Sequence, residues 1–483
     1  MRKLLFFAVL VSMAVSLTAQ PARSFKRGAS ENAFGYPAEI HSLSPGVSWT
    51  YNWGPTPTSY VRDVVGGADA EMEFVPMAWN GNFNESALRS FYTEHPDAKY
   101  LLGFNEPNFR AQANMTPQQA AALWPRLEAI ADEFGLKLVA PALNYPDGAI
   151  NDGNTYQPEQ WMDAFLAAYP QARIDYLALH CYMNSPSAQI GFVENFAKKY
   201  GKQVWLTEFC AWEGTVDSIS QMNTMVQKIQ DLELSPYVYR YAWFKARGSN
   251  AAPYYRLLIT PNMVTHLPPA GTLTWMGQIY TYMSPFDTTY YYRPAELIPA
   301  TNYVYSKGVQ LRPNTDGESD VKLNISSFGI GSVGEYLVEV PQAGEYKLTL
   351  RHSSMNFIST PRLELKCDGV LVANLDLPYT GMTSTQDTWQ TYEATVTLPA
   401  GKHRLTFTGK YSSTCKLAWM RIESQGGFLK GDVNGDGEVS IADVTTLVDL
   451  VMRQTSNERS DVNDDNETSV ADVTALVMIL LNQ

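Results

Sequence analysis

The chain has 483 residues, a length that predicts about two to four domains rather than a single hydrophobic core. Apolar residues make up 45% and charged residues 18% of the chain, which is typical of a globular protein and excludes a disordered one. The net charge of −13 argues against nucleic acid or an anionic membrane surface as a partner.

Residues 1–19 have the features of a signal peptide. Arg2 and Lys3 provide a positive start, and an apolar stretch follows from Leu4 to Val15. This stretch is too short to cross a bilayer, and no other run of about 18 apolar residues occurs in the sequence. We therefore expect cleavage after Ala19, no membrane span, and a secreted protein, whether extracellular, periplasmic or associated with the cell surface.

Residues 35–290 alternate apolar runs with helical stretches such as Thr116–Phe134. Seven runs have the character of strands: Gly46–Tyr51, Glu73–Trp79, Tyr100–Asn105, Lys137–Ala142, Asp175–Tyr182, Gln203–Phe209 and Val238–Phe244. Alternation of this kind predicts a parallel (β/α)8 barrel of the TIM type, with one strand still unrecognised.

Two of these runs deliver a glutamate at their carboxyl end. Tyr100–Phe104 leads into Asn105 and Glu106, and the second run, Gln203–Phe209, carries Glu208. A carboxylate at the end of a buried strand is costly to desolvate unless it has partners or a catalytic task. Two such groups on the active face of a barrel are the requirements of glycoside hydrolysis, in which one donates a proton and the other attacks. The alternative is that each glutamate forms a structural ion pair.

Six segments of this block resemble glycoside hydrolase family 128, a clan A family that acts on β-1,3-glucans. They are Gly46–Trp53, Phe74–Trp79, Tyr100–Asn108, His180–Tyr182, Trp205–Phe209 and Tyr241–Phe244. The resemblance implies that Glu106 is the acid/base, that Glu208 is the nucleophile and that configuration is retained, with no cofactor for catalysis. Clan A usually places this pair on the fourth and seventh strands, so the unrecognised strand should precede Glu106.

Further residues are expected to bind substrate. Asn105 is placed to hydrogen-bond the sugar 2-hydroxyl. His180 and Tyr182 end another strand and are expected to position the substrate or the nucleophile, although a buried core histidine is the alternative for His180. Aromatic rings at strand ends can stack on pyranose rings or belong to the core. The tryptophans expected to stack on sugar are Trp49, Trp53, Trp79 and Trp243.

The four cysteines allow two interpretations. Cys367 and Cys415 lie in one later segment, and export permits a disulfide between them. Pairing of Cys181 with Cys210 is doubtful, because strand alternation turns Cys210 to the side of Glu208 and Cys181 away from His180. The alternative is four buried thiols.

Residues 296–424 contain short alternating runs and predict a β-sandwich of the jelly-roll type. The runs are Glu335–Val340, Tyr346–His352, Arg362–Cys367, Tyr392–Leu398, Arg404–Thr408 and Lys416–Ile422. The segment resembles a family 6 carbohydrate-binding module, mostly at scaffold positions. Ala418 stands where such modules often carry a sugar-binding Asn, so both sugar binding and a spacer role stay open.

Residues 428–483 contain a repeated acidic motif, with 11 Asp or Glu against 3 Lys or Arg. Clustered oxygen side chains at this spacing are typical of a Ca²⁺ loop. The predicted ligands are Asp432, Asn434, Asp436, Ser440 and Asp443, and then Asp461, Asn463, Asp465, Ser469 and Asp472. With the helical runs Val444–Met452 and Val473–Leu481, the tail resembles a type I dockerin, which implies a cohesin-like protein partner.

The sequence therefore predicts a secreted, retaining, endo-acting hydrolase of β-1,3-glucan polysaccharide or oligosaccharide. One alternative is a clan A hydrolase of another β-linkage. The other is a glucan-binding or adhesion protein without catalytic activity.

Overall fold

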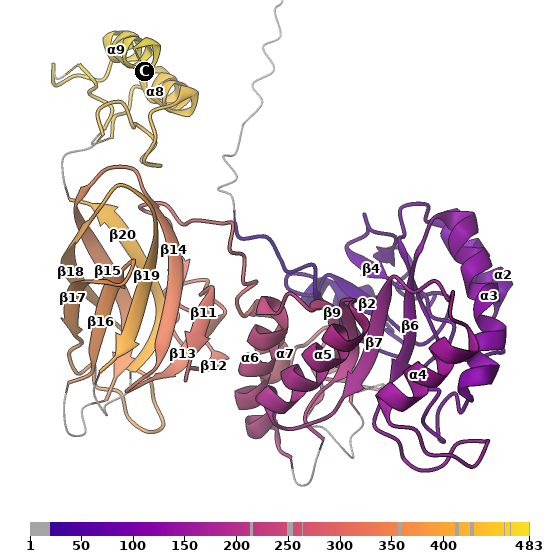
Figure 1. Cartoon of the computed structure of the whole chain (residues 1–483). Helices are drawn as coiled ribbons and strands as arrows, with labels where there is room; N and C mark the ends of the chain where they lie inside the picture. The colour runs from indigo at the N-terminus through magenta and orange to yellow at the C-terminus, as the bar shows by residue number, and fades with distance from the viewer. Residues whose placement is uncertain are drawn as a thin grey trace, which may run out of the picture.

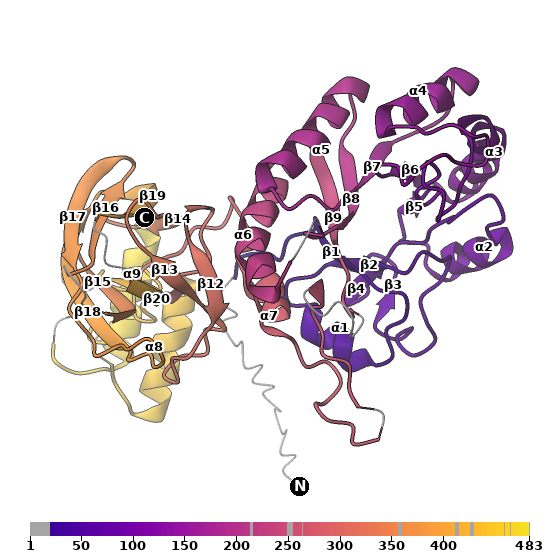
Figure 2. The same cartoon turned by 90° about the horizontal axis from the view of Figure 1, so that it is seen from below.

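The computed structural model describes residues 20–212, 216–248, 255–262, 264–355, 360–410, 415–425, 429–457, 459–463 and 465–482. The expected signal peptide, residues 1–19, lies outside them. Figures 1 and 2 show an α/β domain beside a domain made of strands, with a small two-helix tail at the C-terminus. Across the described ranges, every helix is too short or too polar to cross a membrane.

The first domain is built on one parallel sheet in the order β3-β4-β2-β1-β9-β8-β7-β6-β5. The strands are β1 (Arg27–Ser30), β2 (Trp49–Tyr51), β3 (Val65–Gly66), β4 (Met72–Phe74), β5 (Tyr100–Leu102), β6 (Lys137–Leu143), β7 (Tyr176–Cys181), β8 (Val204–Phe209) and β9 (Val238–Phe244). Backbone hydrogen bonds join β5 to the segment after β4, from Leu102 N to Pro76 O (2.9 Å) and from Ala78 N to Leu102 O (3.0 Å). The sheet therefore curls into a TIM-like barrel.

Strand β1 is the one that the sequence pattern did not reveal. It pairs with β2 on one side and β9 on the other, and all four of its residues are buried. Because β3 pairs only with β4, the barrel strands in order are β1, β2, β4, β5, β6, β7, β8 and β9. Glu106 thus follows the fourth strand and Glu208 lies on the seventh, as expected. The sheet begins at Arg27, before the predicted domain boundary at residue 35.

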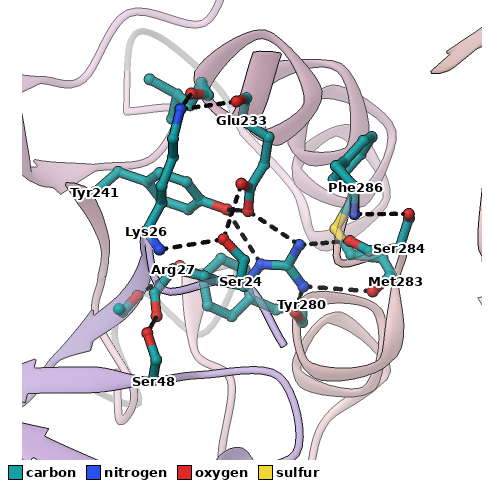
Figure 3. Close-up of polar contacts among 12 residues, drawn as sticks. Ser24, Lys26, Arg27, Ser48, Glu233, Tyr241, Tyr280, Met283, Ser284 and Phe286 are labelled. Atoms are coloured by element: carbon teal, nitrogen blue, oxygen red, sulfur yellow. Dashed lines mark hydrogen bonds and ion pairs between the residues drawn. The ribbon is translucent and has the colours of Figure 1, made fainter. Parts of the chain in front are cut away.

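The side chain of Arg27 anchors β1 to the helices behind it (Figure 3). Its guanidinium donates to the carbonyl oxygens of Tyr280 (3.1 Å) and Ser284 (2.6 Å) at the end of helix α7 (Trp275–Tyr282). It also lies 3.4 Å from a carboxylate oxygen of Glu233 and donates to the Tyr241 hydroxyl (3.1 Å). A charge with 1% exposure is stable only with such partners, so a strand that begins with arginine is part of the core here.

Helices cover the outside of the barrel. They are α1 (Pro37–Leu43), α2 (Glu85–Glu94), α3 (Pro117–Phe134), α4 (Pro158–Ala168), α5 (Pro186–Tyr200), α6 (Ser218–Leu234) and α7. The predicted helix Thr116–Phe134 is α3. Thr116 caps it by accepting from Gln119 N (3.1 Å), and Gly135 ends it with φ 67°. The capping residues Thr116 and Gly135 therefore determine where α3 begins and ends.

The second domain is a two-sheet sandwich in which all six predicted strands occur. One sheet has the order β12-β13-β20-β15-β18, with β10 paired to β20, and the other has the order β11-β14-β19-β16-β17. The strands are β10 (Ile298–Pro299), β11 (Tyr305–Lys307), β12 (Gln310–Pro313), β13 (Leu323–Phe328), β14 (Val333–Val340), β15 (Gly344–Ser354), β16 (Arg362–Cys367), β17 (Val370–Asp376), β18 (Gln390–Leu398), β19 (Gly401–Gly409) and β20 (Cys415–Ser424). The buried side chain of Gln230 on α6 pairs with Ser306 on β11 and joins the sandwich to the barrel.

The cysteines form no disulfide among the described residues, and all four are buried. The predicted pairing of Cys367 with Cys415 is wrong, because both thiols are free, one on β16 and the other on β20. The interpretation as buried thiols is the one that holds.

The tail contains two helices, α8 (Ile441–Arg453) and α9 (Val470–Leu481), which overlap both predicted helical runs. Each follows one copy of the repeated acidic motif. Leu447 and Leu476 are fully buried and form a small core with Val433 and Val462. The tail therefore has a core of its own, separate from that of the other two domains.

Candidate active site

A cavity of about 560 Å³ lies at the carboxyl ends of the barrel strands. Six predicted residues line it: Asn105, Glu106, Glu208, Tyr182, Trp53 and Trp79. A larger hollow of about 1440 Å³ lies between residues 289–297, which connect the two domains, the sandwich and the tail. Neither glutamate lines this hollow. The chemistry that the glutamates can perform therefore belongs to the barrel cavity.

Glu106 follows β5 and is 5% exposed. One of its oxygens, Oε1, accepts from Asn144 Nδ2 (2.8 Å) and lies 2.7 Å from His180 Nδ1. The backbone at Glu106 is left-handed, with φ 45°, and its N–H donates to Ala142 O (2.9 Å). A non-glycine residue with left-handed backbone angles is strained. Glu106 keeps this conformation because the surrounding hydrogen bonds hold it there.

Glu208 lies on β8 and is 4% exposed. Its Oε1 accepts from Trp53 Nε1 (2.7 Å) and Tyr51 OH (3.3 Å), and its Oε2 accepts from the Tyr182 hydroxyl. Both oxygens of Glu208 are thus held by protein donors. Donors of this kind stabilise the ionised carboxylate and fix its direction.

His180 lies between the two glutamates and is fully buried. Its Nδ1 faces Glu106, and its Nε2 lies 3.0 Å from Thr207 Oγ1 and 3.5 Å from Glu208 Oε1. One atom from each of the three groups, a ring nitrogen and two carboxylate oxygens, lies within 4.8 Å of the others. His180 therefore positions both carboxylates and does not line the cavity itself.

Burial and charge shift the pKa values of these groups. Burial disfavours the charged form of His180, but the carboxylates of Glu208 and Glu106 outweigh it, so its pKa is raised. Burial also raises the pKa of Glu208, which His180 opposes and Glu106 reinforces. The pKa of Tyr182 is raised by burial and by Glu208, so its hydroxyl stays protonated and donates.

The predicted tryptophans divide into two pairs. Trp53 and Trp79 line the cavity. Trp49 and Trp243 are fully buried and cannot contact a sugar, so their assignment to substrate binding is wrong. Trp49 faces the barrel interior but lies one layer too deep, against Trp205, at a ring distance of 5.0 Å. Trp243 faces outward and packs on Tyr280 of α7.

Asn105 also lines the cavity, and its side chain is 2% exposed. Its Nδ2 donates weakly to Gln112 Oε1 (3.4 Å), and its Oδ1 is buried without a partner among the described residues. An amide with an unused acceptor beside the acid is consistent with the predicted contact to substrate.

Sequence reasoning missed several residues of the cavity. Asn144 directly follows β6, and the rule that functional groups follow barrel strands identifies it once the end of β6 at Leu143 is known. Phe244 lies next to Trp243 and lines the cavity in its place. Trp212 lines the cavity as well, is 42% exposed and stacks on Tyr255 at 5.1 Å.

The predicted calcium ligands lie in two loops of the tail. One oxygen from each of Asp432, Asp436 and Asp443 lies within 4.8 Å of the others, and the second loop brings Asp461, Asp465 and Asp472 together in the same way. Asn434 and Asn463 donate to the aspartates two positions later, at 2.8 Å and 2.7 Å. Ser440 and Ser469 cap α8 and α9. Clustered carboxylate oxygens are a donor set that fits a hard cation such as Ca²⁺.

A TIM-like barrel with two buried carboxylates on either side of one histidine, at the rim of a cavity, defines a glycoside hydrolase. Residues 32–280, slightly more than half of the chain, match the model of the glycosyl hydrolase catalytic core, and the chain belongs to this family. Residues 299–424 match the model of the family 6 carbohydrate binding module.

Two solved structures are similar to the barrel domain. An endo-β-1,3-glucanase of glycoside hydrolase family 128 (subgroup II) from Pseudomonas viridiflava is 37% identical, with 54% of this chain and 98% of that chain covered and a TM-score of 0.45. Its counterpart from Sorangium cellulosum is 36% identical, with 53% and 97% covered and a TM-score of 0.45.

A curated relative is also similar. Alkali-sensitive linkage protein 1 of Schizosaccharomyces pombe is 29% identical over 248 residues, which cover 49% of this chain. The aligned part spans 41% of the length of that relative. The similarity is thus confined to a part of each protein.

Proposed function

We propose that the chain hydrolyses β-1,3-glucan with retention of configuration, with Glu208 as nucleophile and Glu106 as acid/base. The separation of the glutamates carries this proposal. One oxygen of Glu106 lies within 4.8 Å of one oxygen of Glu208. Such a close approach suits direct attack, because retaining enzymes hold their two carboxyl groups closer together than inverting enzymes, which must leave room for a water molecule.

The hydrogen bonds support the two roles. Both oxygens of Glu208 accept from protein donors, which suits a group that must be ionised before it attacks. Among the described residues, hydrogen-bond donors reach only Oε1 of Glu106, so its Oε2 is available to exchange a proton with the substrate. The environments of the two glutamates therefore differ in the way that their tasks require.

The reaction then has two steps. In the first, a carboxylate oxygen of Glu208 attacks the anomeric carbon, the glycosidic C–O bond breaks, and Glu106 gives its proton to the leaving oxygen. In the second, Glu106 takes a proton from water, whose oxygen attacks the anomeric carbon and displaces Glu208. Both glutamates return to their starting state.

The linkage and the endo mode rest on sequence similarity. The relatives from P. viridiflava and S. cellulosum are named endo-β-1,3-glucanases. Nearly the whole length of each of these two relatives aligns with the barrel domain of this chain. Trp53, Trp79 and Phe244 give the cavity an aromatic surface on which pyranose rings can stack.

Product analysis on laminarin tests the proposal, with lichenan, cellulose and xylan compared under the same conditions. We expect oligosaccharides of several lengths from laminarin and little release from cellulose or xylan. Glucose alone as the first product would contradict endo action, and preferred release from another polymer would favour a different linkage. Binding of laminarin without any release would favour the adhesion protein.

We further propose that the sandwich binds the same glucan and keeps the barrel on its substrate, because residues 299–424 match a carbohydrate-binding family. Depletion of the protein from solution by insoluble β-1,3-glucan tests this when the double variant Glu106→Gln, Glu208→Ala is used. Stronger retention of the full chain than of a chain ending at residue 290 is expected, and equal retention of the two would contradict the proposal.

We also propose that the tail is a calcium-binding dockerin of a secreted protein, which docks onto a cohesin-like partner. The repeated loops and the two clusters of aspartate oxygens support calcium binding. Titration with Ca²⁺ should raise the helical circular dichroism of the tail, and no change on addition of Ca²⁺ would contradict the proposal.

A further inference from the structure

The two oxygens of the Glu106 carboxyl group lie in different surroundings. Oε1 accepts a hydrogen bond from Asn144 Nδ2 (2.8 Å) and lies 2.7 Å from His180 Nδ1. No described residue hydrogen-bonds Oε2, and Glu106 lines the cavity. The carboxyl group is therefore asymmetric before any substrate arrives.

The amide of Asn144 has a fixed orientation. Its Oδ1 accepts from the backbone N–H of Tyr145 at 2.8 Å, so the NH₂ group must be the end that faces Glu106. An amide NH₂ donates and cannot accept, which means that it stabilises Oε1 as an unprotonated oxygen. His180 Nδ1 lies 2.7 Å from the same oxygen, and the carboxylates that raise the pKa of His180 favour its protonated ring, in which Nδ1 is a donor as well.

From this geometry we propose that Asn144 is a positioning residue that keeps the catalytic proton of Glu106 on Oε2, the oxygen that faces the cavity. The inference rests on the proposed acid/base role of Glu106. Asn144 lines the cavity beside Glu106, and in this proposal it acts on the reaction through the Glu106 carboxyl group.

A second asparagine holds Asn144 in place. Asn108 is fully buried, and its Nδ2 donates to Asn144 O (2.6 Å) and Tyr156 O (3.1 Å), while its Oδ1 accepts from Asn144 N (3.3 Å). Asn108 lies two residues after Glu106. The same turn therefore carries the acid and the group that anchors its donor.

Replacement of Asn144 tests the inference in the full chain. A hydrogen bond from an amide to a charged group is worth about 1.5–3 kcal/mol, so Asn144→Ala should lower kcat on laminarin roughly 10- to 100-fold. The loss should be smaller on an aryl β-glucoside oligosaccharide with a good leaving group, because its departure needs no proton.

The pH profile separates positioning from a structural role. Without the donor, the ionised form of Glu106 is less stable, so the basic limb of kcat/KM should move to higher pH. Asn144→Asp has nearly the same size and adds a like charge, so it should move the limb in the same direction. Asn154→Ala, on the same connection and exposed, is the matched control and should leave both readouts unchanged.

Equal losses on both substrates with an unmoved basic limb in Asn144→Ala and Asn144→Asp would overturn the inference. If Asn144→Ala does not fold, as circular dichroism would reveal, the limb of Asn144→Asp decides alone. Failure of the wild-type protein to cleave laminarin would instead refute the proposed function, so the two failures are distinguishable.

Discussion

Acidic side chains gather in two regions of this chain, the barrel cavity and the tail, and the two gatherings are built differently. Glu208 is held by Tyr51, Trp53 and Tyr182, which are separated from it by 157, 155 and 26 positions. In the tail, Asp432 accepts from the backbone N–H groups of Gly435 (2.8 Å) and Gly437 (3.1 Å), only three and five positions away.

The difference teaches how each region depends on the rest of the chain. The two glutamates are held in place only when the barrel is folded, because their partners come from β2, β6 and β7 or from the residues that directly follow these strands. The tail loops are local and have their own small core. We therefore expect changes at the two glutamates and their partners to lower catalysis, and changes in the tail to leave it intact.

The largest effect is expected from loss of the nucleophile. Glu208→Ala should lower kcat by about 10⁴-fold or more, because no other described group lies where it can attack. Azide should restore turnover and give a glycosyl azide of inverted configuration. Glu94→Ala, an exposed glutamate on α2, is the control. Activity close to wild type in Glu208→Ala would remove this residue from the mechanism.

A smaller and more selective loss is expected at the acid. Glu106→Gln keeps the shape of the side chain but has no acidic proton, so hydrolysis of laminarin should fall about 10²- to 10⁴-fold. Glycosylation by a substrate with a good leaving group should be affected far less in pre-steady-state measurements. The same loss for both substrates would contradict a role as general acid.

The donors to Glu208 should control the acidic limb of the pH profile. Glu208 attacks as a carboxylate, and burial raises its pKa, so activity is lost as pH falls through a value above that of an ordinary glutamic acid. Tyr182→Phe removes one donor and should move this limb to still higher pH, with roughly a tenfold loss of kcat.

Tyr169→Phe is the matched control for that experiment, since it removes a tyrosine hydroxyl that donates to Glu128 (2.7 Å) away from the cavity. An acidic limb that stays in place in Tyr182→Phe would show that the hydroxyl does not stabilise the charge on Glu208.

The smallest effect on catalysis is expected from chelation. EDTA should lower the thermal stability of the tail, because Ca²⁺ stabilises a folded loop by binding to it. Hydrolysis of soluble laminarin should not change, because the proposed mechanism assigns every step in the barrel to side chains. A loss of hydrolysis that added Ca²⁺ restores would break the separation between the two regions.

Local patterns in the sequence predicted much of this molecule. Seven barrel strands, helix α3 and both tail helices follow from periodicity and caps, and Glu106 and Glu208 follow from the rule that barrel sites lie at strand ends. The resemblance to family 128 added the assignment of Glu106 as acid/base and Glu208 as nucleophile. The hydrogen-bond donors around the two glutamates independently support this assignment.

The remaining features depend on contacts that no local pattern encodes. Strand β1 has four residues and starts with Arg27, whose partners Glu233 and Ser284 come from much later in the chain. The register of β8 against β9 shifts between Leu206 and Phe209, so simple alternation fails beside Glu208. Depth matters too, because Trp49 points inward and yet lies below the cavity.

The anomeric configuration of the first product is the most direct test of the account. Proton NMR during the first minutes of hydrolysis of a β-1,3-gluco-oligosaccharide distinguishes the two outcomes before mutarotation. Double displacement by Glu208 and water predicts that the β-anomer appears first. Initial release of the α-anomer would mean inversion, and it would contradict the role of Glu208 as nucleophile.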